Sequence, residues 1–386
     1  MSMFFSRDTR VLLKQGANMW EIPVLDGFSF SQASNSSEIT LSESVDATGR
    51  SRRSRQMFND SLAPAEWSLS TYMRPIKCVP GSGDVWMDSG SDANCHAVEE
   101  ALWANFIANN AWTASNGATE GTWADGVVNT SGTLALYEFT GSDVPELGTF
   151  ELFFVMGKSG SEQVYKIAGA CVNEANIEFE LDGIATINWS GFGSLISDEG
   201  SSVPTATNTI SEQITSTSNF IRNRLTTLTM QATDTTAFAG DGDNDGTYNI
   251  TLTGGSLTFS NNITFLTPED LGKVNVPLGH VAGTRTIGGS FTCYLNDAVG
   301  GSADLFQDLM LATTTTVNEF DLIFAVGGDD LPHVDVTMPR CHLEIPQHSI
   351  DDAISLDVTF HSLPLSIAPG ASVNNYEAKL QYVSSS

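Results

Sequence analysis

The chain has 386 residues, of which 41% are hydrophobic and 16% charged, and its formal net charge at pH 7 is −29. This balance excludes a largely disordered chain, and the acidity argues against an outer surface that binds nucleic-acid phosphates. No stretch approaches the roughly eighteen apolar residues of a membrane-spanning helix, and the first residues lack the pattern of a signal peptide.

The first part of the chain predicts antiparallel strands followed by a helix. Val24–Glu43 and Trp67–Met73 alternate apolar and polar residues, which is typical of strands with one buried and one solvent-facing side. A helix is predicted over Asn94–Asn110, because apolar residues recur on one of its faces. An insertion, Ala111–Gly148, follows this helix, and we expect a hairpin through Thr133–Phe139.

The segment between the two early strands, Ser44–Pro64, is strongly basic. It holds Arg50, Arg52, Arg53 and Arg55, four of the 17 basic residues in the chain. Long loops in compact domains are usually functional, and the simplest partner for a basic patch on an acidic chain is another copy of that chain. A nucleic-acid contact is one alternative, although no aromatic residues interleave with the arginines, and a merely solvated loop is another.

The second part of the chain repeats the first. FELFFVMG at Phe150–Gly157 returns as FDLIFAVG at Phe320–Gly327. Four further blocks recur in the same order, as the pairs Val24–Glu43 with Thr251–Glu269, Trp67–Met73 with Gly289–Leu295, Ala101–Ile107 with Asp304–Met310, and Val164–Gly191 with Val334–Ser362. The last alignment places Cys171 on Cys341 and Trp189 on Phe360. Five blocks in one order predict a tandem duplication, and two unrelated β domains are the alternative.

The repeat predicts a mainly β protein with two tandem β-sandwich or partial-barrel domains, each with one flanking α-helix. The first domain covers 4–195 with the insertion 111–148, and the second covers 220–365 with a helix over Ser302–Ala312. A Ser/Thr-rich linker, 196–219, joins them, and 366–386 is expected to be a C-terminal arm, extended or disordered.

Few residues indicate chemistry, and we predict no catalytic residue and no cofactor. The six His residues show no spacing typical of a nucleophile relay or a zinc site. Asp241, Asp243 and Asp245 copy the front half of a calcium loop, but Leu252 stands where that loop needs a bidentate Glu. A glycine-rich turn is the stronger interpretation, with calcium as the minor one. The five Cys residues form no CxxC pair, which predicts reduced thiols and folding in the cytoplasm.

Several runs resemble the major tail tube proteins of tailed bacteriophages over nearly the whole chain: residues 7–43, 55–75, 188–193 and 254–295. The resemblance implies β-sandwich subunits with a flanking helix, joined edge to edge into rings that stack as a hollow tube. It implies that Ser44–Pro64 and Asp270–Thr284 reach the neighbouring ring. Arg50, Arg52, Arg53, Arg55, Lys273 and His280 are therefore the expected ring-stacking residues. The chain is similar to the variety in which three two-domain chains make a pseudo-sixfold ring.

The resemblance also implies partners and a place in the virion. The expected partners are other copies of the chain, the tape-measure protein, the tail terminator, tail-tip or baseplate proteins, and a sheath protein only if the tail is contractile. Genomic DNA would pass transiently through an acidic lumen, for which Asp26, Glu38 and Asp182 are candidates. The expected location is the virion tail, after assembly in the host cytoplasm.

Two other classes of function remain open from the residues. One is a two-domain carbohydrate-binding or adhesion module, with calcium at Asp241–Asp245 and exposed aromatic rings at Trp112 and Trp123. The other is an enzyme such as a glycosidase, for which no pair of carboxylates stands out.

Overall fold

Strands dominate the chain, so the prediction of a mainly β protein is confirmed. The computed structural model describes residues 4–39, 47–49, 55–77, 95–108, 112–113, 122–123, 128–131, 134–140, 147–206, 220–240, 245–272, 274–311, 318–350, 353–366 and 376–384. Within these residues there are two short α-helices, α1 (Glu100–Phe106) and α2 (Ser302–Leu311). We call residues 4–206 the first half and residues 220–384 the second half.

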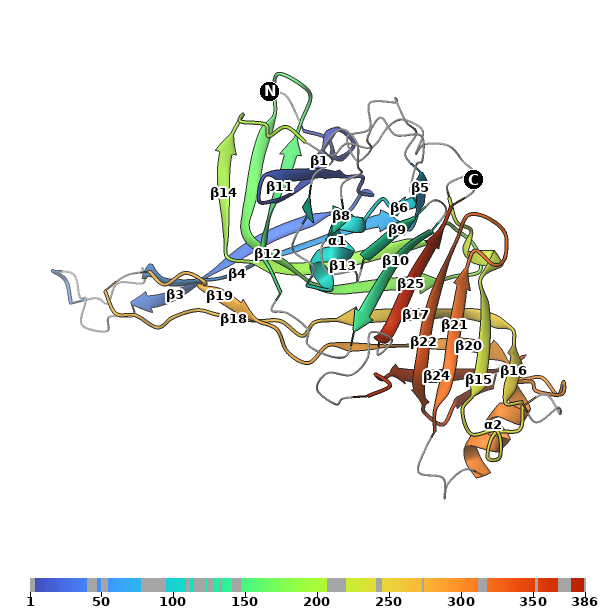
Figure 1. Cartoon of the computed structure of the whole chain (residues 1–386). Coiled ribbons are helices and arrows are strands. Elements are labelled where there is room, and N and C mark those ends of the chain that lie inside the picture. The colour runs from blue at the N-terminus through green and yellow to red at the C-terminus, as the bar shows by residue number, and fades with distance from the viewer. Residues whose placement is uncertain are drawn as a thin grey trace.

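Eight antiparallel segments form a sheet that runs through both halves, here called the main sheet (Figure 1). In order across the sheet they are β3 (Ser29–Ile39), β4 (Gln56–Tyr72), β13 (Thr186–Gly193), the second part of β12 (Gln163–Phe179), β17 (Leu252–Ser260), β20 (Thr286–Tyr294), β24 (Ile354–Ser362) and β23 (Gln347–Ile350). The β12–β17 ladder, from Glu174 opposite Ser260 to Phe179 opposite Gly255, joins the two halves.

A second layer of strands packs behind the main sheet. In the first half it contains β2 (Asn18–Ile22), β1 (Arg10–Gln15), β11 (Phe150–Met156), the first part of β12 and β14 (Leu195–Gly200). In the second half it contains β16 (Thr247–Ile250), β15 (Thr227–Ala232), β21 (Phe320–Val326), β22 (His333–Leu343), β25 (Tyr376–Val383), β10 (Leu134–Thr140) and β9 (Val128–Ser131).

Smaller elements complete the described chain. They are the 3₁₀ turns η1 (Ser6–Asp8) and η4 (Asn223–Leu225), and the two-stranded pairs β5 (Pro75–Lys77) with β6 (Cys95–Ala97), β7 (Trp112–Thr113) with β8 (Thr122–Trp123), and β18 (Thr264–Leu266) with β19 (Gly279–Val281). None of the described helices has the length and apolar character to cross a membrane.

The same strand pairings occur once in each half. In the first half, β1 pairs with β2 and β11, β11 with β12, and β12 with β13 and β14, while β3 pairs with β4 and β4 with β13. The second half makes the matching set: β15 pairs with β16 and β21, β21 with β22, and β22 with β24 and β25, while β17 pairs with β20 and β20 with β24. Even a β-bulge recurs, between Phe150 and Leu152 and again between Phe320 and Leu322.

The ladders correct the sequence alignment by one residue at one place and by two residues at another. Phe150 lies opposite Ala170, and Phe320 lies opposite Cys341, so Cys341 corresponds to Ala170 and not to Cys171. By the same comparison, Trp189 corresponds to Val358 and not to Phe360. A one-residue slip turns a side chain to the opposite face of a strand, so the register decides which alignment is physical.

The end of the chain also differs from its prediction. Residues 376–383, expected within an extended or disordered arm, form strand β25, which lies between β22 of the second half and β10 of the first-half insertion. Ala378, Leu380 and Tyr382 are fully buried there, and this burial is what orders the segment. The predicted linker likewise begins inside a strand, because residues 196–200 belong to β14.

One hydrophobic core serves both halves. The largest buried cluster contains side chains from every layer of the first and second halves. At its centre the Trp103 indole packs against Phe139 of the insertion, Trp189 of β13 and Phe259 of β17, with ring centroids 5.7, 4.6 and 5.4 Å away. Because Phe259 comes from the second half, the two halves are fused through their core as well as through the main sheet.

Candidate assembly surfaces

The main sheet buries one face and leaves the other exposed or half-buried. Alternate residues of each strand point to opposite faces, so Ser and Thr alternate with large apolar residues in the sequence. The buried face includes Leu69, Trp189, Ile177, Leu257, Phe291 and Val358. On the other face, Ser68 lies between Ser29 and Ser190, and the Oγ atoms of Ser29 and Ser68 are 2.8 Å apart. Ser70 donates to Asn188 Oδ1 at 2.7 Å.

Acidic and uncharged groups make up this polar face, with His361 at one end of β24. Its acids are Glu66, Glu174, Glu178 and Asp357. The eight segments of the main sheet, all within the described residues, contain no Lys and no Arg. Such a surface repels phosphate groups and offers hydroxyl and amide groups to water. These four acids were not predicted from the sequence. The pattern that indicates such a face is a set of strands in which Ser or Thr alternates with apolar residues and Lys and Arg are absent.

The acids expected in a lumen lie elsewhere. Asp26 is in the turn before β3 and Glu38 is near the end of β3. Asp182 lies in the turn between β12 and β13, where its carboxylate is 3.6 Å from the Arg224 guanidinium and both side chains are largely exposed.

The main sheet ends in two strands that pair on one side only among the described residues. β3 pairs with β4 alone, and β23 pairs with β24 alone. Their counterparts in the other half, β17 and the second part of β12, are bonded to each other. Exposed strand edges are rare in soluble proteins because they pair with other chains. The two edges are therefore candidate assembly surfaces.

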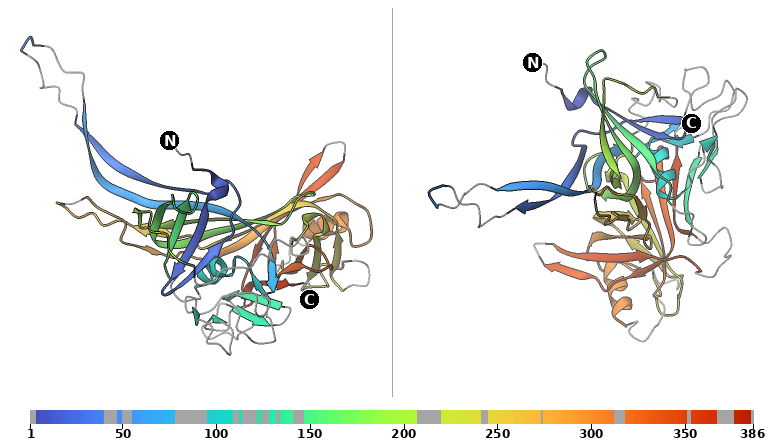
Figure 2. Two further views of the ribbon diagram at one scale, coloured as in Figure 1. Left: turned by 90° about the horizontal axis from the view of Figure 1, so that it is seen from above. Right: turned by 90° about the vertical axis from the view of Figure 1, so that its left-hand side faces the viewer.

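Two long hairpins project from the body on the same side (Figure 1). One is formed by β3 and β4, here called the arm, and it bends away from the body (Figure 2). The other is formed by β18 and β19. The two touch where Leu62 N–H donates to Asn275 O at 2.8 Å and Asn275 N–H donates to Asp60 O at 3.1 Å. Because β4 starts at Gln56, the last part of the predicted loop Ser44–Pro64, residues 56–64, is strand.

The structure places only two of the six expected ring-stacking residues. Arg55 Nη1 lies 3.0 Å from Glu38 Oε2 across the arm. His280 packs against the Phe265 ring, and its Nε2 is 3.1 Å from Leu147 O, so it anchors the second hairpin to the first half. Arg50, Arg52, Arg53 and Lys273 lie outside the described residues.

Both hairpins expose large apolar side chains. Met57 and Phe58 are 56% and 52% exposed on the arm, and Leu278 is 78% exposed on the other hairpin. Apolar surface of this kind, next to charged residues, is typical of contacts with another protein.

The expected calcium ligands do not come together among the described residues. Asp241 and Asp243 lie outside them, and Asp245 Oδ1 accepts the Thr247 backbone N–H at 2.8 Å, as in a turn. The part of the chain that the structure describes holds no cluster of His, Cys, Asp or Glu able to bind a metal. Trp123 is 6% exposed and stacks on Trp20, so it is not a surface ring for binding sugars, and the side chain of Trp112 lies outside the described residues.

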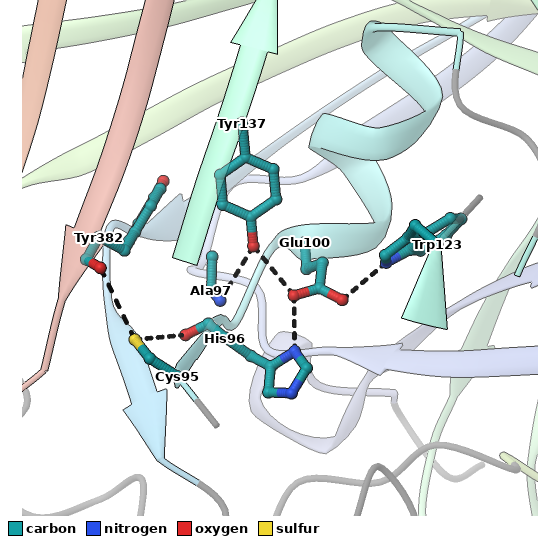
Figure 3. Close-up of polar contacts among 7 residues, drawn as sticks. All are labelled: Cys95, His96, Ala97, Glu100, Trp123, Tyr137 and Tyr382. Carbon is teal, nitrogen blue, oxygen red and sulfur yellow. Dashed lines mark hydrogen bonds and ion pairs between the residues drawn. The ribbon is translucent and has the colours of Figure 1, made fainter. Parts of the chain in front are cut away.

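A buried polar cluster, which sequence reasoning missed, joins α1 to the insertion (Figure 3). Glu100 is fully buried, and its Oε2 lies 2.8 Å from His96 Nδ1. Tyr137 OH donates to the same oxygen at 2.9 Å, and Trp123 Nε1 donates to Oε1 at 2.6 Å. The neighbouring Glu99 accepts a hydrogen bond from Tyr382 OH of β25. Two adjacent glutamates in an apolar helix were the available signal.

Burial raises the pKa of Glu99 to about 7. Its Oε2 has no hydrogen-bond partner among the described residues. The folded protein therefore holds a proton that the unfolded chain releases near pH 4.5. Stability from this group is complete below pH 4.5 and falls as the pH rises from 4.5 to 7.

We expect Glu99→Gln to remove this pH dependence, because the amide carries no titrating proton while still accepting from Tyr382. Relative to the parent chain, the variant should gain about 2 to 3 kcal/mol of stability between pH 5 and pH 8, at 1.36 kcal/mol per pKa unit. Urea unfolding at several pH values measures this. Glu178→Gln on the exposed face is the control and should show no such trend. A constant difference between the Glu99 variant and the parent would contradict the assignment.

Comparison with known proteins agrees with the surfaces just described. No family model matches the chain. Its sequence is 31% identical over 382 residues to the tail tube protein pb6 of Escherichia phage T5, in an alignment that covers 96% of this chain and 75% of that relative. At this identity and coverage, the chain belongs to the tail tube proteins of tailed phages, and it is a structural protein of the virion tail rather than an enzyme.

Proposed function

We propose that the chain is a tail tube subunit that supplies two adjacent units of the tube wall. The two units are tandem domains, residues 4–195 and 220–365, that descend from one duplicated ancestor. The doubled set of strand pairings, with a β-bulge at the same place in each, supports this proposal. The second domain is completed by β25, which corresponds to β14 of the first.

The β12–β17 ladder is the observation that carries the proposal, because it serves as a template for the contact between chains. Asn176 lies opposite Thr258 in it. The counterpart of Asn176 is Gln347 of β23, and the counterpart of Thr258 is Ser31 of β3. The free β23 edge of one copy would thus pair with the free β3 edge of the next, with Gln347 opposite Ser31.

Such a contact is head-to-tail, so it closes into a ring when the rotation between units allows. Three chains would supply six similar units, as expected for a pseudo-sixfold ring, and every main-sheet edge would then be paired. Closure removes the exposed edges that otherwise lead to uncontrolled association.

The polar face of the main sheet would line the lumen. The opposite face is committed to the core, so only the polar face is free to meet the channel. Glu66, Glu174, Glu178 and Asp357 would make an acidic wall without Lys or Arg, along which DNA passes without adhering.

The outer ends of the two hairpins would reach the next ring of the stack. Their exposed apolar residues and the basic segment Arg50–Arg55 suit a contact with an acidic copy of the same chain. The further partners proposed are the tape-measure protein, the tail terminator, tail-tip or baseplate proteins, and a sheath protein only if the tail is contractile.

Disulfide cross-linking tests ring closure. We expect Ser31→Cys with Gln347→Cys, in a Cys78→Ser background, to give covalently closed rings of chains on mild oxidation. The four other cysteines are buried and should not compete. Denaturing gels without reductant should show dimers and then a final trimer.

Two variants serve as controls. Ser31→Cys alone should give no covalently closed ring. Ser36→Cys with Gln347→Cys, in which the first cysteine is displaced along β3, should cross-link far less. Efficient linkage of the displaced pair, or none for the matched pair in assembled tubes, would contradict the proposed register.

A further inference from the structure

The seam between the two halves of one chain is sealed by apolar residues. The β18–β19 hairpin lies over it, with the Phe265 ring 6.3 Å from the Phe192 ring of β13. Ile263, Cys171, Leu147 and Ala108 form a separate buried cluster at the same place.

The matching place in the second half holds titratable residues instead. In the first half Phe192 lies opposite Cys171, and in the second half the corresponding pair is His361 opposite His342. His361 Nε2 also lies 3.0 Å from Glu344 Oε1, and the side chains of both are 55% exposed. Phe192 and Cys171 are thus replaced by two histidines, with a carboxylate beside them.

A backbone carbonyl at the matching place in the second half has its hydrogen bond without a neighbouring chain. In the first half the carbonyl of Val172 accepts a hydrogen bond from Asn261 Nδ2, which comes from the other half. Leu343, the counterpart of Val172, instead accepts from Asn318 Nδ2 of its own half at 2.8 Å. The Leu343 carbonyl is therefore hydrogen-bonded within the free chain.

We propose that His342, Glu344 and His361 form a protonation-sensitive seat for the arm of the next copy of the chain. The inference rests on the proposed ring, in which the arm occupies the position that the β18–β19 hairpin occupies within one chain. The contact between chains would then depend on pH, whereas the equivalent contact within one chain, which is apolar, would not.

The surrounding charges set the direction of the effect. On β22, Arg340 is paired with Glu319. On β20, Gly288 lies opposite His361 and brings no charge, while Asp357 lies further along β24, and Arg285 is paired with Glu377. The incoming arm carries Glu38, Asp60 and Arg55. Among the described residues of the arm, Glu38, Asp60 and Glu66 outnumber Arg55, so this part of the arm is net negative and protonation of the histidines beside Glu344 favours its binding.

Sedimentation velocity of the purified full chain, at constant ionic strength and several pH values, tests this inference. Between pH 8 and pH 6 we expect the concentration for half-maximal ring formation to fall at least about tenfold, as expected for uptake of one or two protons. In His342→Gln with His361→Gln it should fall less than about twofold, because glutamine keeps the size and polarity but not the proton. His333→Gln, on β22 beside Asp335, is the matched control and should keep the parent response.

The outcomes separate the two proposals. The overall charge of the chain changes with pH almost equally in the parent and the variants. The effect of the seat is therefore the difference in pH response between the parent and the double variant. If rings form but the double variant keeps the full pH response, the seat is wrong and the ring stands. If the parent chain forms no ring at any pH, the proposed ring fails and the seat with it. Equal urea unfolding of parent and double variant shows that the fold is intact.

Discussion

Replacing Trp103 with Ala is expected to remove about 3 to 5 kcal/mol from the free energy of unfolding, the range found for buried tryptophans. The indole is fully buried, and it packs against rings from the insertion, β13 and β17. It also donates from Nε1 to Tyr382 OH of β25 at 2.9 Å. Urea unfolding followed by circular dichroism measures the loss.

The same substitution tests whether the two halves share one core. Because Trp103 contacts Phe259 and Tyr382 of the second half, its loss should destabilise both halves together, in one transition. Tyr294→Ala is the control, since that ring is 54% exposed, and its effect should stay within about 0.5 kcal/mol. A Trp103 variant as stable as the control would show that the central cluster does not hold the halves together.

Replacing Glu100 with Ala is expected to have the second large effect, a loss of about 3 kcal/mol. It leaves His96, Tyr137 and Trp123 without the carboxylate that each contacts, in a region with no access to water. Buried groups left without a partner cost more than the hydrogen bonds themselves contributed.

This loss should also loosen the insertion. Tyr137 lies in β10, which pairs with β25, so limited proteolysis of the Glu100 variant should cut within 111–148 faster than in the parent chain. Glu178→Ala on the exposed face should change neither the stability nor the cleavage. Unchanged cleavage in the Glu100 variant would mean that strand pairing alone holds the insertion.

The sequence was sufficient to predict the class of fold because its patterns are local. Alternation in WSLSTYM and SLDVTF identifies strands with one buried face, and these segments fall in β4 and β24 in the structure. The hairpin predicted through Thr133–Phe139 is confirmed, because β10 pairs with β9.

Features that depend on distant contacts were predicted poorly. Residues 376–383 contain alternating apolar residues. Their local sequence does not show that they pair with both β22 and β10 as strand β25. The alignment of Cys171 with Cys341 was wrong because the turn after the first strand of the pair is one residue longer in the second half, with six residues between Met156 and Gln163 and seven between Val326 and Val334.

The buried cluster around Glu100 could not be assembled from sequence for a similar reason. Its members come from β6, α1, β8, β10 and β25, and the register of those strands brings them together. The acids of the polar face could not be assigned to one surface from the sequence, because strands of both halves have to pair before that surface exists.

An end-on reconstruction of the purified assembly by electron microscopy tests the central claim most directly. We predict three chains in each ring and six similar β units around the channel, with β23 of every chain beside β3 of its neighbour. Rings of six chains, or a wall in which the β3 edge stays unpaired, would contradict the account.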